Sequence, residues 1–303
     1  MQERTHTYLK WLLLIGIILT AGGMGQEVFA TFFLPEPLTA EVMPARNAVR
    51  EPPYVMEAKL YIPSHTPTPT PKPEYQQHVP FQPGETLTYS VNWSGINGGS
   101  VTIRIPEILD YQGHDVFQIL VEAESNAFVS VFYSLEYMLE TLIDVDGLFV
   151  RRYWMKQKEN GKKRERKYEF DQENNVVHQG DKRYYITYGI QDEVSAVFYV
   201  RTLDLEVGTS VYLDVYAKRQ NWRVKCDVLA TESVTVKAGT FDAIVVEPEL
   251  HFDGIMKKGK IKAWFTNDEH RIPVQVKSKI AIGAITMELE EYTLGEETVI
   301  LNK

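Results

Sequence analysis

Residues 81–103 read FQPGETLTYSVNWSGINGGSVTI and place a glycine-rich segment between two apolar runs. In the first run, every second residue from Leu87 to Trp93 is apolar, which is the spacing of a strand with one buried face. After the glycines, SVTIRI alternates in the same way. The stretch therefore predicts two neighbouring strands.

The segment from Gly95 to Ser100 raises the question of a phosphate-binding loop. Such a loop requires a helix directly after it, because the N–H groups of the helix N-terminus hold the anion. A strand follows here, so we interpret Gly95–Ser100 as a hairpin turn in which Gly and Asn supply positive φ. The segments VKAGTF (236–241) and AIGAI (281–285) are interpreted as turns for the same reason.

The rest of the chain after residue 80 repeats the strand pattern. Alternating runs such as TSVYLDVYA, WRVKCDVLA and PVQVKSKIAIGAITMELEEY indicate roughly a dozen strands separated by turn residues. We expect a mainly β domain with one large antiparallel curved sheet, or a barrel or half-barrel. Residues 191–203, within IQDEVSAVFYVRTLD, are the exception, because Val194, Val197, Phe198 and Arg201 recur at helical intervals. They predict one helix of three turns with Asp192 as its N-cap.

The N-terminal segment 1–30 has the pattern of an export signal. Arg4 and Lys10 precede an uncharged stretch from Trp11 to Gln26, and VFA ending at Ala30 offers a cleavage site. The apolar stretch also suits a single membrane anchor if it continues into VFATFFL. We take the anchor as the first interpretation and secretion after cleavage near Ala30 as the alternative. Both place the remaining chain outside the cytoplasm.

A proline-rich linker is expected at residues 31–79, because HTPTPTPKP cannot join a sheet and should be extended. The β domain is assigned to residues 80–295 and a C-terminal tail to 296–303. A net charge of −9 disfavours binding to nucleic acid, whose phosphates select basic surfaces. The single cysteine, Cys226, alternates with charged residues on an apolar strand face and is expected to be a buried, inert thiol.

Catalytic and metal-binding motifs are not found in this sequence. The seven histidines are scattered and none has the spacing of a zinc site, and no Gly-x-Ser-x-Gly motif occurs. Acidic pairs such as Asp144 and Asp146 lie where strands meet turns, which favours solvated charge over a glycosidase pair. We therefore expect no enzyme activity, no metal and no cofactor.

One strongly basic segment, RRYWMKQKENGKKRERK (151–167), carries nine cations against two anions. Asn160-Gly161 predicts a two-residue turn that pairs Lys156 with Glu165 and Tyr153 with Tyr168. The candidate contacts to an anionic surface are Lys158, Lys162, Lys163 and Arg164. The alternative, which we prefer here, is a solubilising hairpin whose lysines prevent sheet-to-sheet aggregation.

Five separated motifs, among them FQPGETLTYSVNWSGINGGSV, QDEVSAVFYVRTLDLEVG and VKAGTFDAIVVEP, resemble the domain of unknown function 3108 family of exported bacterial proteins. The resemblance covers residues 81–295 and implies an all-β fold around one helix, without established catalytic residues. FTNDEHRIPVQVKSKIAIGAI is also similar, more weakly, to the closing strands of lipoprotein-carrier and RseB-like half-barrels.

Two functions follow from these observations. The first is a non-enzymatic cell-envelope protein that binds an apolar, lipid-like ligand or a protein partner, with membrane lipid or an envelope protein as the expected partner. The second is a structural or assembly module without a small ligand. An internal apolar cavity would favour the first function, whereas a filled core would favour the second.

Overall fold

The computed structural model describes residues 79–217, 219–249, 261–280 and 283–295. The predicted N-terminal segment 1–30, the linker 31–79 apart from Val79, and the tail 296–303 lie outside the described residues. The turn expected at 281–285 lies partly outside them.

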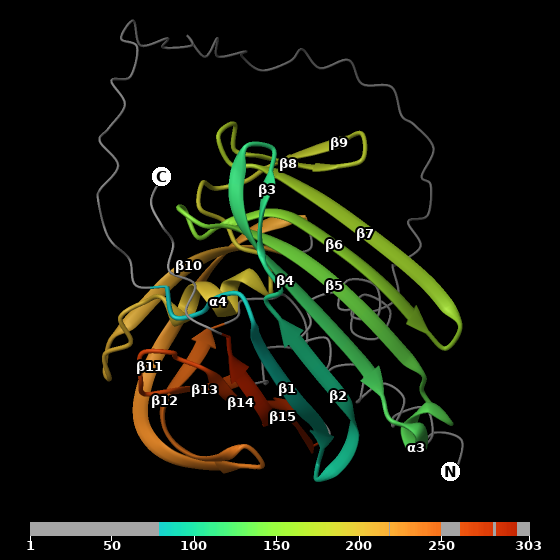
Figure 1. The fold of residues 1–303 in the computed structure, drawn as a ribbon, viewed down its shortest axis with the longest axis vertical. Helices are drawn as coiled ribbons and strands as arrows, with labels where there is room; N and C mark the ends of the chain where they lie inside the picture. Colours follow the sequence, from blue (N-terminus) through green and yellow to red (C-terminus); the bar gives the residue numbers. More distant parts are fainter. Residues whose placement is uncertain (1–78, 218, 250–260, 281–282, 296–303) are drawn as a thin grey trace, which may run out of the picture.

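Strands make up most of the described chain, in agreement with the predicted mainly β class (Figure 1). The first nine strands are β1 (Glu85–Trp93), β2 (Ile96–Arg104), β3 (Ile108–Tyr111), β4 (His114–Ser125), β5 (Leu135–Asp144), β6 (Val150–Glu159), β7 (Lys162–Asp171), β8 (Val176–Gln179) and β9 (Lys182–Tyr185). The other six are β10 (Ser210–Ala217), β11 (Gln220–Val236), β12 (Gly239–Glu249), β13 (Ile261–Thr266), β14 (Pro273–Ile280) and β15 (Gly283–Leu294). Two short helices, α3 (Ala127–Ser130) and α4 (Ser195–Arg201), complete the described elements.

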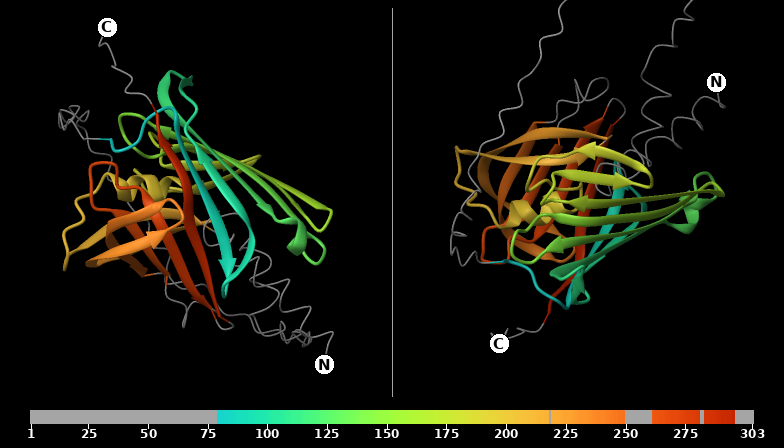
Figure 2. Two further views of the ribbon diagram at one scale, coloured as in Figure 1. Left: turned by 60° about the horizontal axis from the view of Figure 1, so that its bottom comes forward. Right: turned by 90° about the horizontal axis from the view of Figure 1, so that it is seen from above.

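All fifteen strands belong to one antiparallel sheet with the order β10-β11-β12-β13-β14-β15-β1-β2-β4-β5-β6-β7-β8-β9, and β3 pairs with β4 beside this path. Figure 2 shows the sheet bent into two halves, with β1 between them. β9 and β10 are the two ends of the order, so the sheet is not closed by backbone pairing in the described residues. The Asn221 side chain nevertheless donates to the Tyr185 carbonyl at 3.2 Å, which brings the two edges together at one end.

The hairpin predicted around the glycine-rich segment forms, but its turn is shorter than expected. Ser94 and Gly95, with φ of 47° and 87°, make the whole turn, and β2 already begins at Ile96. Gly99 lies inside the strand, where a Cβ atom would come within 2.0 Å of the Glu124 carbonyl oxygen on β4. The second half of the glycine segment therefore permits close strand packing rather than the turn itself.

The basic hairpin has the predicted register. Asn160 and Gly161, with φ of 47° and 78°, form the turn, Lys156 lies opposite Glu165, and Tyr153 lies opposite Tyr168. The turn expected in VKAGTF also forms, because β11 ends at Val236 and β12 begins at Gly239.

The predicted helix near 191–203 is present but shorter, since α4 has seven residues rather than three turns. Val194, and not Asp192 as predicted, is the N-cap residue, because the Asp192 carboxylate accepts the N–H groups of Val194 and Ser195 at 2.7 Å each and fixes a turn before the helix. At the other end, Thr202 Oγ1 donates to the Tyr199 carbonyl at 2.8 Å. These local bonds confine the helix to the residues between them.

The helix α3 was not predicted. It follows Asn126, whose side chain accepts the Val129 N–H at 2.8 Å as an N-cap. A helix of four residues is too short to show a periodic apolar pattern, so the Ser-Asn dipeptide before it was the available signal.

The inner faces of the two halves meet in a large apolar core, and α4 connects this core to a smaller one. Phe198 of α4 packs in the large core, whereas Val200 packs in the smaller core against β10–β13. The helix therefore fills the bend between the two halves of the sheet.

A buried ion pair fixes α4 in this bend. The two terminal nitrogens of Arg201 lie 2.6 and 2.8 Å from the two carboxylate oxygens of Glu85 at the start of β1. Arg201 also donates to the carbonyls of Pro80 and His270 at 2.9 Å each. Its guanidinium carbon lies 5.3 Å from the ring centre of Phe81. One side chain thus joins the helix, the incoming chain and the β13–β14 turn.

In the described parts of the chain, every helix is too short to cross a bilayer.

Replacing Arg201 by Met should destabilise the protein by about 3–5 kcal/mol, because the Glu85 carboxylate would remain buried without its partner. Chemical denaturation of the variant and of wild type would measure this loss. Arg223→Met is the matched control: Arg223 is exposed where it pairs with Asp214, so the same substitution there should cost about 1 kcal/mol or less. Equal losses in the two variants would contradict the role given to Arg201.

Candidate apolar binding site

An apolar cavity of about 250 Å³ lies beside α4, against β10–β13, with β1 and β2 on its other side. On the β10–β11 wall the alternation of strand residues turns Leu213, Val215, Val224 and Trp222 to the same face, because Leu213 pairs with Val224 and Val215 with Trp222. The opposite wall includes Leu87 of β1. Regular strand pairing thus builds a surface of hydrocarbon around the space.

The helix closes the cavity along one side. Ala196, Val197 and Val200 of α4 line it, and the small side chain at Ala196 leaves room that a larger residue would fill. Trp222 is half-buried in the wall and its Nε1–H donates to the Ala217 carbonyl at 2.9 Å. Its indole ring is therefore held in place beside the cavity.

Two charged side chains, Glu193 and Arg201, occur among the described residues that line the cavity. Arg201 is already bonded to Glu85, Pro80 and His270, so its donors are occupied. Glu193 has none of the ion pairs seen between described residues. Its carboxyl interacts electrostatically with Asp192 and Arg166.

Burial, and after it the neighbouring Asp192 carboxylate, raise the pKa of the Glu193 carboxyl from 4.5 to about 8. Arg166 acts in the opposite direction, but more weakly. The pKa values of Tyr137 and Tyr153 are also raised, chiefly by burial, and the charge of Glu193 adds to both. Glu193 is therefore mostly protonated at neutral pH, and the polar group at the cavity carries little charge.

Asp192, next to Glu193, is buried but well bonded. Its carboxylate accepts the Thr141 hydroxyl and the N–H groups of Val194 and Ser195. Burial nevertheless raises its pKa. These bonds hold the loop before α4 and thereby set where Glu193 lies.

Cys226 lies where the sequence predicted, on the apolar face of β11, and it lines the cavity. Burial raises the pKa of its thiol to about 12, so the thiolate is scarce at neutral pH. The prediction of a buried, inert thiol is confirmed.

The predicted anionic-surface residues lie far along the chain from this cavity, at the tip of the β6–β7 hairpin. Lys162 and Lys163 are exposed there. Lys158 lies 2.5 Å from Glu136 of β5, which neutralises it. Arg164 is half-buried and points to the sheet face opposite Lys163, because successive strand residues alternate. Lys162 and Lys163 are thus both exposed beside the turn, Lys163 lies opposite Lys158 in the hairpin, and Arg164 is on the other face.

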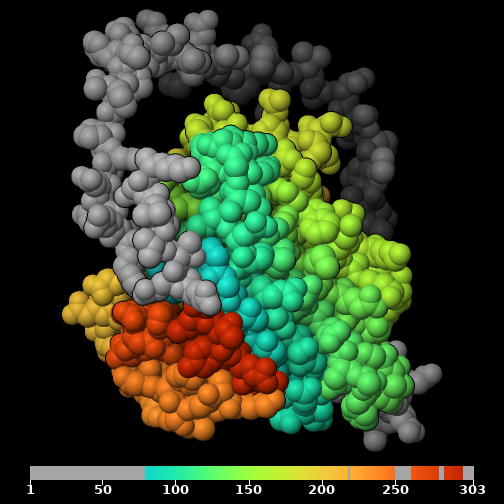
Figure 3. All heavy atoms as spheres, in the orientation of Figure 1, coloured from blue at the N-terminus to red at the C-terminus, as the bar shows by residue number. Residues whose placement is uncertain are grey.

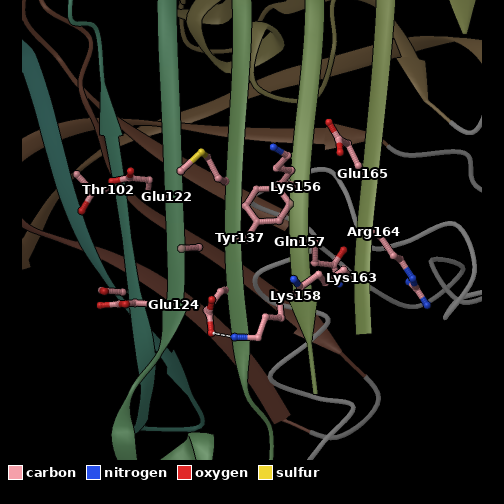
Figure 4. Close-up of a pocket in the computed structure, with 14 residues that line it drawn as sticks. Thr102, Glu122, Glu124, Tyr137, Lys156, Gln157, Lys158, Lys163, Arg164 and Glu165 are labelled. Carbon is pink, nitrogen blue, oxygen red and sulfur yellow. Dashed lines mark hydrogen bonds and ion pairs between the residues drawn. The ribbon is translucent and has the colours of Figure 1, made fainter. Parts of the chain in front are cut away.

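An open groove of about 870 Å³ runs over β2 and β4–β7 on the face opposite the core (Figure 4). Its acidic residues include Glu122 on β4 and Glu136 on β5, and its basic residues include Lys156 and Lys158 on β6. Arg104 and Glu122 pair at 2.7 Å near its edge. The charges largely compensate each other, so this groove is a solvated sheet face.

Asp144 differs from the expectation of solvated charge. It is buried, and its carboxylate accepts the N–H groups of Asp146 and Gly147 and the Nε–H of Arg151 at 2.6 Å. It stabilises the β5–β6 turn, whereas Asp146 is exposed. Among the described residues, no group of three or more His, Cys, Asp or Glu is arranged to hold a metal ion.

The cavity and its carboxyl group were not predicted, because their walls come from strands distant in sequence. A signal did exist: Glu193 and Arg201 are charged residues within an otherwise apolar helical pattern. Charged residues in such a position require a partner inside the fold, and Arg201 has one.

Several solved structures are similar to this chain. The β-barrel-like protein of the DUF1849 family from Brucella abortus matches with a TM-score of 0.51 and 8% identity, over 71% of this chain and 99% of that one. A DUF1089-family protein from Pseudomonas aeruginosa matches with a TM-score of 0.39 and 12% identity, over 60% and 90%. A candidate exported protein with a YmcC-like fold from Bacteroides fragilis matches with a TM-score of 0.30 and 13% identity, over 71% and 98%.

The first of these likenesses supports the fold alone, and the other two are too distant to carry an argument. No curated protein matches the chain in sequence. The weaker predicted similarity to lipoprotein-carrier half-barrels stays a prediction. The family described as "Protein of unknown function (DUF3108)" matches residues 88–290, which confirms the resemblance predicted from the sequence, and the chain therefore belongs to this family.

Proposed function

We propose that this is a non-enzymatic, extracytoplasmic protein of the cell envelope, and that it binds an apolar ligand such as an acyl chain in the cavity beside α4. The location is supported by the apolar segment behind Arg4 and Lys10, which lies outside the described residues. That segment would tether the domain to the membrane, or be removed near Ala30.

The cavity is the observation that carries the proposal. At about 250 Å³ it exceeds the ~150 Å³ of a dry apolar cavity that admits benzene. Each methylene group that leaves water for such a site contributes about 0.8 kcal/mol. Its walls are paired strands and a clamped helix, which resist collapse. A purely structural module would instead be expected to fill this space with side chains.

The polar groups favour binding over catalysis. An enzyme would place several free polar side chains around one point in the cavity. Here Arg201 is occupied by Glu85, and Glu193 is mostly protonated at neutral pH. A protonated carboxyl can donate one hydrogen bond to a carbonyl or hydroxyl oxygen, which would orient the polar end of an apolar ligand.

Filling the cavity should abolish ligand binding. We expect brominated dodecanoate to quench part of the tryptophan fluorescence of the full chain, because its bromine atoms would enter the cavity that Trp222 lines. Ala196→Phe should weaken this binding at least about tenfold, since each pair of excluded methylenes contributes about 1.6 kcal/mol. Thr231→Phe, which adds the same ring on an exposed part of β11, should leave binding unchanged. Undiminished binding to Ala196→Phe would contradict the assignment.

Glu193 should make the stability depend on pH. The carboxyl keeps its proton up to about pH 8 when folded but loses it near 4.5 when unfolded. The unfolding free energy of wild type should therefore fall as pH rises from about 5 to about 8. Glu193→Gln cannot ionise and should become progressively more stable than wild type over this range.

Denaturant titrations at several pH values would measure this difference. Glu206→Gln is the matched control, because Glu206 is exposed and the same change there should not alter the pH dependence. Parallel curves for wild type and Glu193→Gln would show that Glu193 is not held protonated by the fold.

A further inference from the structure

Exposed apolar side chains gather at one end of the sheet. Phe128 is 67% exposed and Val131 is 77% exposed in the α3 segment, and Ile96 is 51% exposed at the β1–β2 turn. Figures 1 and 3 show α3 and the β1–β2 tip next to each other at this end. Neighbouring exposed apolar residues of this size mark interaction sites more often than chance positions.

Hydrogen bonds connect three turns at this end into one surface. The Asn126 side chain donates to the Asn97 carbonyl at 2.8 Å, and its backbone N–H donates to the Gly98 carbonyl at 3.0 Å. On the other side, the Asn160 N–H donates to the Ser134 carbonyl at 2.8 Å, and the Ser134 N–H to Asn160 Oδ1 at 3.0 Å. We call residues 94–98, 126–134 and 159–163 the tip surface.

The fold directs the apolar residues of α3 outward. The Asn126 cap fixes the helix, and Val129 is buried beneath it. Phe128 and Val131 therefore project from the opposite side, where Phe128 makes an edge contact with Phe132 at 6.1 Å between ring centres. The core is already filled by Val129, so packing within the fold does not explain these exposed side chains.

Cations flank the apolar residues. Lys162 and Lys163 are exposed at the β6–β7 turn, which Asn160 ties to Ser134. Lys158 is neutralised by Glu136 at 2.5 Å, but no described acidic residue forms an ion pair with Lys162 or Lys163. The tip surface thus combines projecting apolar groups with adjacent unpaired positive charge.

We propose that the tip surface docks on a bilayer that contains anionic lipid. Phe128 and Val131 enter the boundary between headgroups and acyl chains, and Lys162 and Lys163 contact the anionic headgroups. The apolar side chains are separated and lie on polar turns, which suits this interfacial zone. There, apolar side chains contact acyl chains while the polar turn residues contact headgroups and water. The two exposed lysines complement the negative surface of such a membrane. The docking does not depend on the cavity beside α4.

An environment-sensitive fluorophore would test this in the full chain. The label is attached to Val131→Cys and, as a matched control, to Tyr185→Cys, which is 86% exposed on β9 at the other end of the molecule. The native thiol of Cys226 is buried and should not react. Vesicles of neutral lipid, or of neutral lipid with added phosphatidylglycerol, each carrying brominated acyl chains, are compared at low and high salt.

We expect a blue shift and bromine quenching at position 131 with the anionic vesicles and at low salt, and neither at position 185. Because each labelled variant contains the full chain, an N-terminal tether would be present in both. Lys162→Gln with Lys163→Gln should lower the ratio of docked to undocked label roughly 30-fold, since each cation near such a surface contributes about fivefold. Phe128→Ser should lower it as well.

Three outcomes would overturn the proposal. One is an unchanged signal at position 131, or equal signals at positions 131 and 185. The second is docking that ignores lipid charge and survives the paired lysine changes. The third is a shift that needs no vesicles and grows with protein concentration, which would assign the tip surface to a second copy of the chain.

Discussion

The buried contact between Arg201 and Glu85 organises the domain. A helix of seven residues is too short to be stable alone, so α4 depends on tertiary contacts to keep its place. Arg201 bonds to β1 through Glu85, to the incoming chain through Pro80 and to the β13–β14 turn through His270. Because all four groups are buried or half-buried, moving the helix would leave a charge without a partner, and the free-energy cost holds the arrangement together.

The cavity is a consequence of this arrangement. The sheet curves around α4 on two sides. The hydrogen bonds between its paired strands limit how closely those strands can approach the helix. A helix clamped by Arg201 at one end and by the Asp192 turn at the other cannot slide into the remaining space. The open space therefore lies where rigid walls meet a small residue, Ala196, rather than in a loosely packed core.

Sequence reasoning succeeded where the governing interactions are local. Asn160-Gly161 and the alternating residues on either side fix the β6–β7 register. The alternation of apolar and charged residues along β11 likewise places Cys226 in an apolar wall. It was less successful where contacts between strands distant in the sequence determine the local structure. Gly99 is required because the backbone of Glu124, 25 positions further along the chain, packs closely against it. The sequence pattern assigned this glycine to the β1–β2 turn, and the predicted turn was therefore too long.

The candidate site shows the same division. Glu85 and Arg201 are separated by 116 positions, and no spacing rule connects them. The walls of the cavity come from α4 and strands on both sides of the bend, so its existence depends on the complete topology. The basic hairpin could be found from composition, but its meaning changes once Asn160 and Ser134 bring it beside the exposed Phe128.

We infer that the space beside α4 is a dry cavity open to apolar molecules. Crystals of the full chain under xenon pressure would test it most directly, because xenon enters dry apolar cavities and is readily located by its scattering. The account predicts xenon between α4 and the Val215–Trp222 wall, with little change in the protein. Ordered water in that space, or side chains filling it without xenon, would contradict the claim.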